Sequence, residues 1–118
     1  MKHALVIEDV PIIAMMIQDE LAELGFSVAV AATESQAIAL ADAHCPDLIM
    51  ADARLEEGSG VEAVRQICRD QSIPVIFMTA DLDAVEVAIG EAVLLEKPFT
   101  SSQLRSGINM AGPMPISV

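Results

Sequence analysis

Residues 4–9 read ALVIED, a short apolar run that ends in two adjacent acids. Residues 48–52, LIMAD, repeat this pattern, and residues 93–97, VLLEK, end in a lysine. Short and nearly continuous apolar runs are typical of parallel strands that are covered on both faces. With two further runs, the sequence predicts strands at about 4–8, 27–32, 47–51, 74–78 and 92–96.

The segments between these runs have the apolar spacing of helices. In the first segment, five apolar residues share one helical face and are expected to point inward: Ile13, Met16, Ile17, Leu21 and Leu24. Gly25 suits the end of this helix. Three later segments open with a Ser or Thr that is followed three positions on by Gln or Glu, a capping pattern: Thr33 with Gln36, Ser59 with Glu62, and Thr100 with Gln103. A further short helix is expected near 83–89.

Alternating strands and helices predict an α/β fold, a doubly wound five-stranded parallel sheet with helices on both faces. At 118 residues the chain is expected to form one domain, residues 1–111, followed by a loose C-terminal tail at residues 112–118. In sheets of this type, ligands bind beyond the carboxyl ends of the strands. The acids and the lysine at the strand ends are therefore expected to meet in one pocket.

The composition limits the classes of partner. The net charge is −12, and the only aromatic residues are three phenylalanines, so we expect no nucleic-acid binding. No apolar run approaches the ~20 residues of a membrane span, and a cytoplasmic location without membrane contact is expected. Cys45 and Cys68 lack ligand spacing and are expected to be reduced thiols. His3 and His44 are expected to be surface residues.

Four groups of residues at the predicted strand ends resemble a response-regulator receiver domain: Glu8-Asp9, Asp52 with a loop that ends at Gly60, Thr79-Ala80, and Lys97-Pro98-Phe99. The resemblance covers roughly residues 3–110. It implies the flavodoxin-like strand order 2-1-3-4-5, which is the order that general fold rules associate with chemotaxis receivers. It also implies a cytoplasmic switch in a two-component or phosphorelay system.

Clustered carboxylates must take up a proton or bind a cation, and hard oxygen ligands favour Mg²⁺ or Mn²⁺. We expect the ligands to be the carboxylates of Asp9 and Asp52, the backbone carbonyl of Arg54, and Glu8 through a water molecule. Asp52 is the expected phosphoacceptor, attacking phosphorus to give an acyl phosphate. Thr79 and Lys97 are then expected to balance the charge on the phosphoryl oxygens.

Other residues near the expected pocket have secondary roles in this interpretation. Ala80 leaves room for the phosphoryl group, and by resemblance the Lys97–Pro98 bond is cis, which aims the lysine inward. Arg54 and Asp81 are either a pair that screens the pocket mouth from water or two unrelated surface charges. Leu94 stands where receivers usually keep a switching aromatic residue, so we expect no aromatic switch.

An uncharged outer stripe on the first helix is the expected docking face for a histidine kinase or a histidine phosphotransfer protein: Pro11, Met15, Gln18 and Ala22. The downstream partner is expected to be a further, unidentified protein. The chain is not expected to be an enzyme for a separate substrate, although it can catalyse its own dephosphorylation. Whether it is a stand-alone regulator or part of a longer protein stays open.

Two alternative functions remain. Leu94 favours a phosphorylation-independent receiver-like binding module, whereas the intact Asp52, Thr79 and Lys97 oppose it. A Mg²⁺-dependent phosphohydrolase of small molecules would also use Asp52 as its nucleophile. Such an enzyme usually needs an acid near the nucleophile to protonate the leaving group, and Arg54 cannot serve as one.

Overall fold

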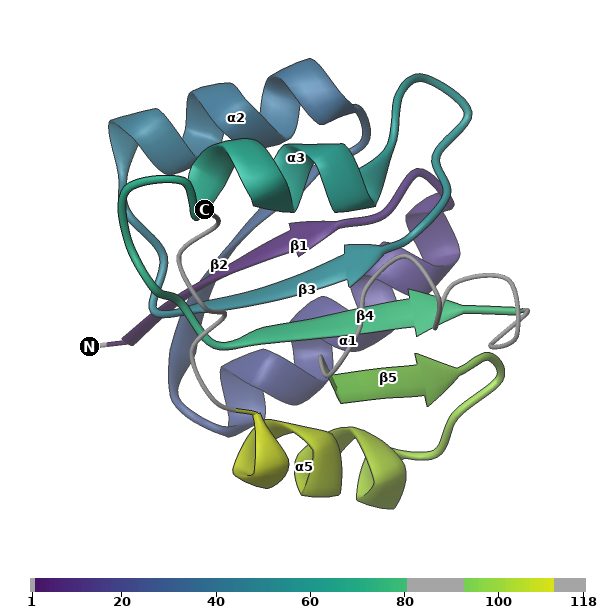
Figure 1. The fold of residues 1–118 in the computed structure, drawn as a ribbon. Helices are drawn as coiled ribbons and strands as arrows, with labels where there is room; N and C mark the ends of the chain where they lie inside the picture. Colours follow the sequence, from purple (N-terminus) through teal and green to yellow (C-terminus); the bar gives the residue numbers. More distant parts are fainter. Residues whose placement is uncertain (1, 81–92, 112–118) are drawn as a thin grey trace.

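A computed structural model describes residues 2–80 and 93–111 (Figure 1). These residues form one five-stranded sheet in the order β2-β1-β3-β4-β5, and each pair of neighbouring strands is parallel. The strands are β1 (Lys2–Ile7), β2 (Phe26–Ala31), β3 (Leu48–Asp52), β4 (Val75–Thr79) and β5 (Val93–Glu96). The predicted fold class and strand order are confirmed.

The helices of the described residues cover both faces of the sheet (Figure 1). They are α1 (Pro11–Glu23), α2 (Glu34–Ala43), α3 (Gly60–Ile67) and α5 (Ser101–Met110). In β1, Leu5 and Ile7 pack in the core beneath α2 and α3, whereas Ala4 and Val6 pack in the core beneath α1 and α5. None of the described helices has the length and apolar character needed to cross a membrane. The helix expected near 83–89, Asp81 and the tail at 112–118 lie outside the described residues.

The predicted capping residues begin the helices as expected. The hydroxyls of Thr33, Ser59 and Thr100 each accept a hydrogen bond from the backbone N–H three residues later. At Thr100 the box is complete, because the side chain of Gln103 accepts the N–H of Thr100 in return. At α2, Gln36 instead accepts the N–H of Ala32, one residue before the cap. Gly25 ends the first helix at a φ of 92°, a conformation that favours glycine.

The predicted inner face of α1 needs correction at Met16 and Leu24, which are exposed. The buried residues of α1 are Ala14, Ile17 and Leu21. They are spaced three and four residues apart, and the small Ala14 permits close approach to the sheet. Met16 precedes Ile17 by one residue, a rotation of about 100° around the helix, and so points outward.

The prediction of a surface position is correct for His44 but wrong for His3, which is buried. Nδ1 of His3 lies 2.9 Å from the hydroxyl of Ser27, and the backbone N–H of His3 donates to Asp47 Oδ2 at 2.8 Å. The rings of His3 and His44 stack with their centroids 3.9 Å apart. The stacked rings lie at the amino-terminal edge of the sheet, where β1 begins.

Burial and the nearby His44 lower the pKa of His3, against smaller opposing effects of the hydrogen bond with Ser27 and of Asp47. As the pH falls, the His3 imidazole is therefore protonated in the unfolded chain before it is protonated in the folded protein. Neutral His3 contributes stability above its ordinary pKa, and this contribution is lost as the pH falls toward the pKa of His3 in the folded protein. We expect His3→Gln to lose less unfolding free energy than the parent between about pH 7.5 and about pH 5.5. Urea titrations followed by far-ultraviolet circular dichroism suit a chain without Trp or Tyr.

The matched control is His44→Gln, which removes the neighbouring ring but keeps His3 in place. It should retain most of the parent's pH dependence, because burial has the larger effect on His3. Equal pH dependence in His3→Gln and the parent would contradict the prediction.

Candidate functional site

The sheet brings together the polar residues that end its strands. Asp52 and Thr79 are the last residues of β3 and β4, Glu8 directly follows β1, and Lys97 directly follows β5. The backbone N–H of Lys97 donates to the carbonyl of Thr79 at 2.8 Å, which extends the pairing of β4 and β5 by one step. These residues therefore share the carboxyl edge of the sheet, as predicted.

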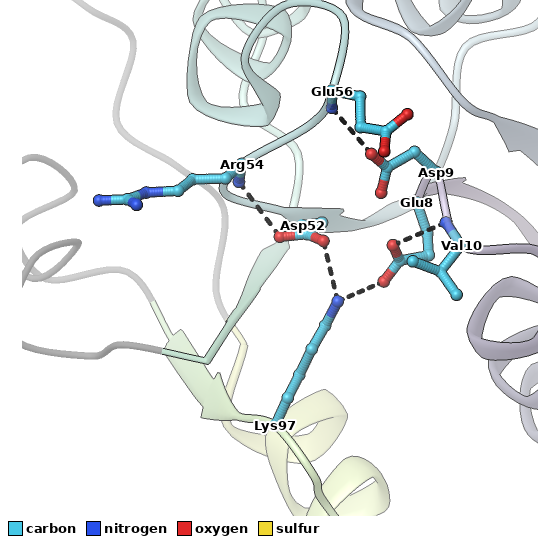
Figure 2. Close-up of polar contacts among 7 residues, drawn as sticks. All are labelled: Glu8, Asp9, Val10, Asp52, Arg54, Glu56 and Lys97. Atoms are coloured by element: carbon cyan, nitrogen blue, oxygen red, sulfur yellow. Dashed lines mark hydrogen bonds and ion pairs between the residues drawn. The ribbon is translucent and has the colours of Figure 1, made fainter.

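The Lys97 ammonium is the centre of this cluster (Figure 2). Its Nζ lies 2.5 Å from Glu8 Oε1 and 2.8 Å from Asp52 Oδ2. Burial opposes the charge of Lys97, but the hydrogen bonds to Asp52 and Glu8 outweigh burial and raise its pKa. Lys97 is therefore a cation at neutral pH, and it links residues at the ends of three different strands.

The Glu8 carboxylate is fully buried and has a partner on each oxygen. Oε1 accepts from Lys97, and Oε2 accepts the backbone N–H of Val10 at 3.1 Å (Figure 2). Burial raises the pKa of Glu8, whereas the hydrogen bond from Lys97 opposes that change. A buried carboxylate of this kind needs such partners to remain charged.

Asp9 is half-buried and connects the end of β1 to the loop that follows Asp52. Its Oδ2 accepts the backbone N–H of Glu56 at 2.8 Å. Burial would raise the pKa of Asp9, but this hydrogen bond and smaller effects outweigh it, and the pKa is lowered. Asp9 is therefore charged at neutral pH.

Glu8, Asp9 and Asp52 each present one carboxylate oxygen within 4.8 Å of the others. Three hard oxygen donors at this separation fit Mg²⁺, which binds through a few carboxylates and keeps several water molecules. The Arg54 N–H donates to Asp52 Oδ1 at 3.1 Å, while the exposed Arg54 side chain extends away from the acids (Figure 2). The assignment of the Arg54 carbonyl and of Glu8 as ligands stays a prediction.

The remaining residues predicted for the pocket differ in how deeply they are buried. Thr79 is buried at the end of β4, and Ala80 is exposed directly after it. The Lys97–Pro98 bond is cis, as predicted, and Pro98 is exposed. Leu94 is half-buried on β5, where it packs against the core beneath α2 and α3.

The model of the response regulator receiver domain matches residues 4–109 of this chain. The chain belongs to this family. Receiver domains of response regulators act in two-component signalling, where they interact with histidine kinases or phosphotransfer proteins and bind Mg²⁺ in the active site.

Relatives and solved structures agree with this family. The receiver is 37 % identical over 114 residues to the phyllosphere-induced regulator PhyR of Methylorubrum extorquens, covering 91 % of this chain and 42 % of PhyR. The solution structure of the PhyR receiver domain of Erythrobacter litoralis superposes with a TM-score of 0.85 at 32 % identity, covering 99 % of this chain and 96 % of that one.

A third match bears on the metal. The receiver domain of the sensor histidine kinase PA1611 from Pseudomonas aeruginosa, solved with a magnesium ion in its active-site cleft, gives a TM-score of 0.80 at 29 % identity. The match covers 92 % of this chain and 94 % of that one. The receiver spans about half the length of the curated relatives it matches.

Sequence reasoning missed the residues that hold the loop after Asp52. The Glu34 carboxylate accepts the N–H of Ser59 at 2.9 Å, and the Glu34 N–H donates to the carbonyl of Glu57 at 3.3 Å. With Glu56 bound to Asp9, the loop is fixed to the ends of both β1 and α2. Gly60 marks where the loop passes close to β3, because a Cβ there would overlap the carbonyl oxygen of Asp52.

We expect Gly60→Ala to lower the free energy of unfolding by about 1–3 kcal/mol, because the loop must move away from the Asp52 backbone. Gly107→Ala is the matched control in α5. A Cβ at Gly107 would make ordinary contacts of 3.5 Å and 3.6 Å with Leu95. It should raise the unfolding free energy by about 0.5–1 kcal/mol, the usual gain over glycine inside a helix. Urea unfolding measures both, and equal stability of the two variants would contradict the prediction.

Proposed function

We propose that this receiver is a phospho-accepting switch, in which Asp52 takes a phosphoryl group from a phosphohistidine of a histidine kinase or a phosphotransfer protein. The observation that carries the proposal is the contact of Lys97 Nζ with Asp52 Oδ2 at 2.8 Å, next to Asp9 at the open edge of the sheet. A lysine fixed on the acceptor is placed to balance charge when the acceptor gains a phosphoryl group.

In the proposed transfer, a carboxylate oxygen of Asp52 attacks phosphorus in line. A bond from this oxygen to phosphorus forms while the P–N bond to the donor imidazole breaks, and the electron pair leaves with the imidazole nitrogen. Lys97 and the Thr79 hydroxyl balance charge on the phosphoryl oxygens, and exposed Ala80 leaves space beside them. Hydrolysis of the acyl phosphate at the same site returns the switch to its starting state.

Asp9 and Asp52 would hold the divalent cation, together with the carbonyl of Arg54. When bound, Mg²⁺ supplies positive charge against the phosphoryl oxygens. The partly exposed carboxylates of Asp9 and Asp52 suit this role, because Mg²⁺ keeps part of its water shell. The screening pair of Arg54 and Asp81 stays a prediction, since Asp81 lies outside the described residues.

The downstream partner in this proposal is a protein. One structural relative is described as the anti-anti-sigma factor PhyR from Bartonella quintana, with a TM-score of 0.79 at 34 % identity. The net charge of −12 supports a protein partner rather than nucleic acid, because a phosphate backbone would be repelled.

Intact mass after incubation with acetyl phosphate and Mg²⁺ tests the phosphorylation step. We expect one adduct of about 80 Da on the parent, corresponding to one phosphoryl group. Asp52→Asn keeps the shape of the acceptor but removes its nucleophilic carboxylate, so it should gain no adduct. An unmodified parent that also fails to bind beryllofluoride would overturn the proposal in favour of a phosphorylation-independent binding module.

We further propose that the donor docks on α1. The four predicted docking residues, Pro11, Met15, Gln18 and Ala22, are all exposed. Exposed Met16 and half-buried Phe99 help line an adjacent groove of about 620 Å³, which extends between α1 and residues 97–104 and reaches Lys97. An uncharged helix face beside an apolar groove suits the apolar side of a helical bundle.

Met15→Glu should slow transfer from a phosphorylated histidine phosphotransfer protein roughly tenfold or more, a loss of about 1.4 kcal/mol in donor binding. Its rate with acetyl phosphate should not change, because this small donor needs no docking face. Met110→Glu is the matched control, since Met110 is also an exposed methionine and lies at the C-terminal end of α5. Stopped reactions separated by Phos-tag electrophoresis give both rates, and equal protein-donor rates for the two variants would remove the docking proposal.

A further inference from the structure

We infer that Glu8 is a positioning residue that holds the Lys97 ammonium on the acceptor, and that it does not ligate the divalent cation. This inference rests on the proposed function, in which Lys97 serves the phosphoryl group. It assigns separate tasks to the two adjacent acids that follow β1.

The first argument is access to water. The Glu8 side chain has no exposed surface, whereas that of Asp52 is 12 % exposed and Asp9 is half-buried as a residue. A ligand that acts through a water molecule must adjoin the water shell that Mg²⁺ retains. Asp9 and Asp52 have surface that is open to water, whereas Glu8 has none, although its carboxylate lies within 4.8 Å of theirs.

The second argument is the contacts of Glu8. Its two oxygens are directed to protein donors, Oε1 to Lys97 at 2.5 Å and Oε2 to the N–H of Val10 at 3.1 Å (Figure 2). The Val10 bond fixes the carboxylate, and the methylene that distinguishes Glu from Asp lets it reach the ammonium. Lysine has three N–H donors, so Lys97 can keep its bond to Glu8 while it serves either Asp52 or a phosphoryl oxygen.

The third argument is the charge balance of the cluster. Glu8, which is fully buried, and Lys97, whose side chain is 16 % exposed, form an ion pair of zero net charge. Asp9 and Asp52 then present two negative charges, which a divalent cation balances. Removing Lys97 from Glu8 would leave a buried carboxylate without its charged partner, which costs free energy. Cation binding at Asp9 and Asp52 should therefore leave the pair intact.

Two charge-conserving variants test the inference by isothermal titration with Mg²⁺. Asp9→Glu displaces a ligand by one methylene, and Mg²⁺ tolerates such displacement poorly, so affinity should fall roughly tenfold or more. Glu8→Asp shortens the side chain that is proposed to hold Lys97 and keeps its charge, so the affinity for Mg²⁺ should change by less than about threefold. Equal losses of affinity in the two variants would overturn the inference.

Nuclear magnetic resonance of the lysine ammonium groups provides a readout that is independent of affinity. The chain has only two lysines, Lys97 and the exposed Lys2, so Lys2 is an internal reference for rapid proton exchange with water. In the parent, Lys97 should exchange slowly with and without saturating Mg²⁺. In Glu8→Asp it should exchange severalfold faster. Exchange of the parent's Lys97 at the rate of Lys2 once Mg²⁺ is bound would contradict the inference.

Circular dichroism of both variants verifies that they fold, and acetyl phosphate labelling of the parent separates the two proposals. If Asp52 gains the adduct but Lys97 exchanges at the rate of Lys2 once Mg²⁺ is bound, the role of Glu8 is overturned and the proposed function is left intact. Slow Lys97 exchange without any adduct would overturn phosphorylation and leave the Glu8–Lys97 assignment intact.

Discussion

The arrangement of the site depends on concentrated negative charge at one edge of the sheet. Strands β1 and β3 are neighbours, so Glu8, Asp9 and Asp52 meet within a few ångströms. Two like charges about 4 Å apart repel by about 4 kcal/mol at an effective dielectric constant of 20. Lys97 contacts two of the three acids directly and thereby offsets part of this repulsion. The charge that remains favours a bound cation.

Much of the fold and the location of the site could be predicted from local patterns. Short, nearly continuous apolar runs predicted the strands, and capping residues such as Ser59 and Thr100 marked where helices begin. The convergence of Asp52 and Lys97 followed from one rule, that parallel strands share a carboxyl edge. The strand order and the cis bond before Pro98 came from the family resemblance, because local patterns do not determine either.

The errors arose where a residue's surroundings depend on distant parts of the chain. Met16 has the polarity of a core residue, but the rotation of α1 against the sheet places Ala14 inside instead. His3 is buried because Ser27, His44 and Asp47 surround it, and their proximity requires the folded sheet. The loop after Asp52 likewise depends on Glu34, which lies on α2 and has no sequence signal that links it to Ser59.

The segment after β5 joins the chemistry of the site to its surroundings. Lys97 contacts Asp52, while the adjoining Pro98 and Phe99 line the groove beside α1. A shift of Lys97 toward a phosphoryl oxygen would therefore act on residues that line a surface groove, through two intervening peptide bonds. Leu94 is not aromatic, and Lys97 itself reaches the groove, so the segment from Lys97 to Phe99 links Asp52 directly to this surface. If Glu8 holds Lys97 as we propose, it also limits how far this segment can move, and so affects the groove as well as the site.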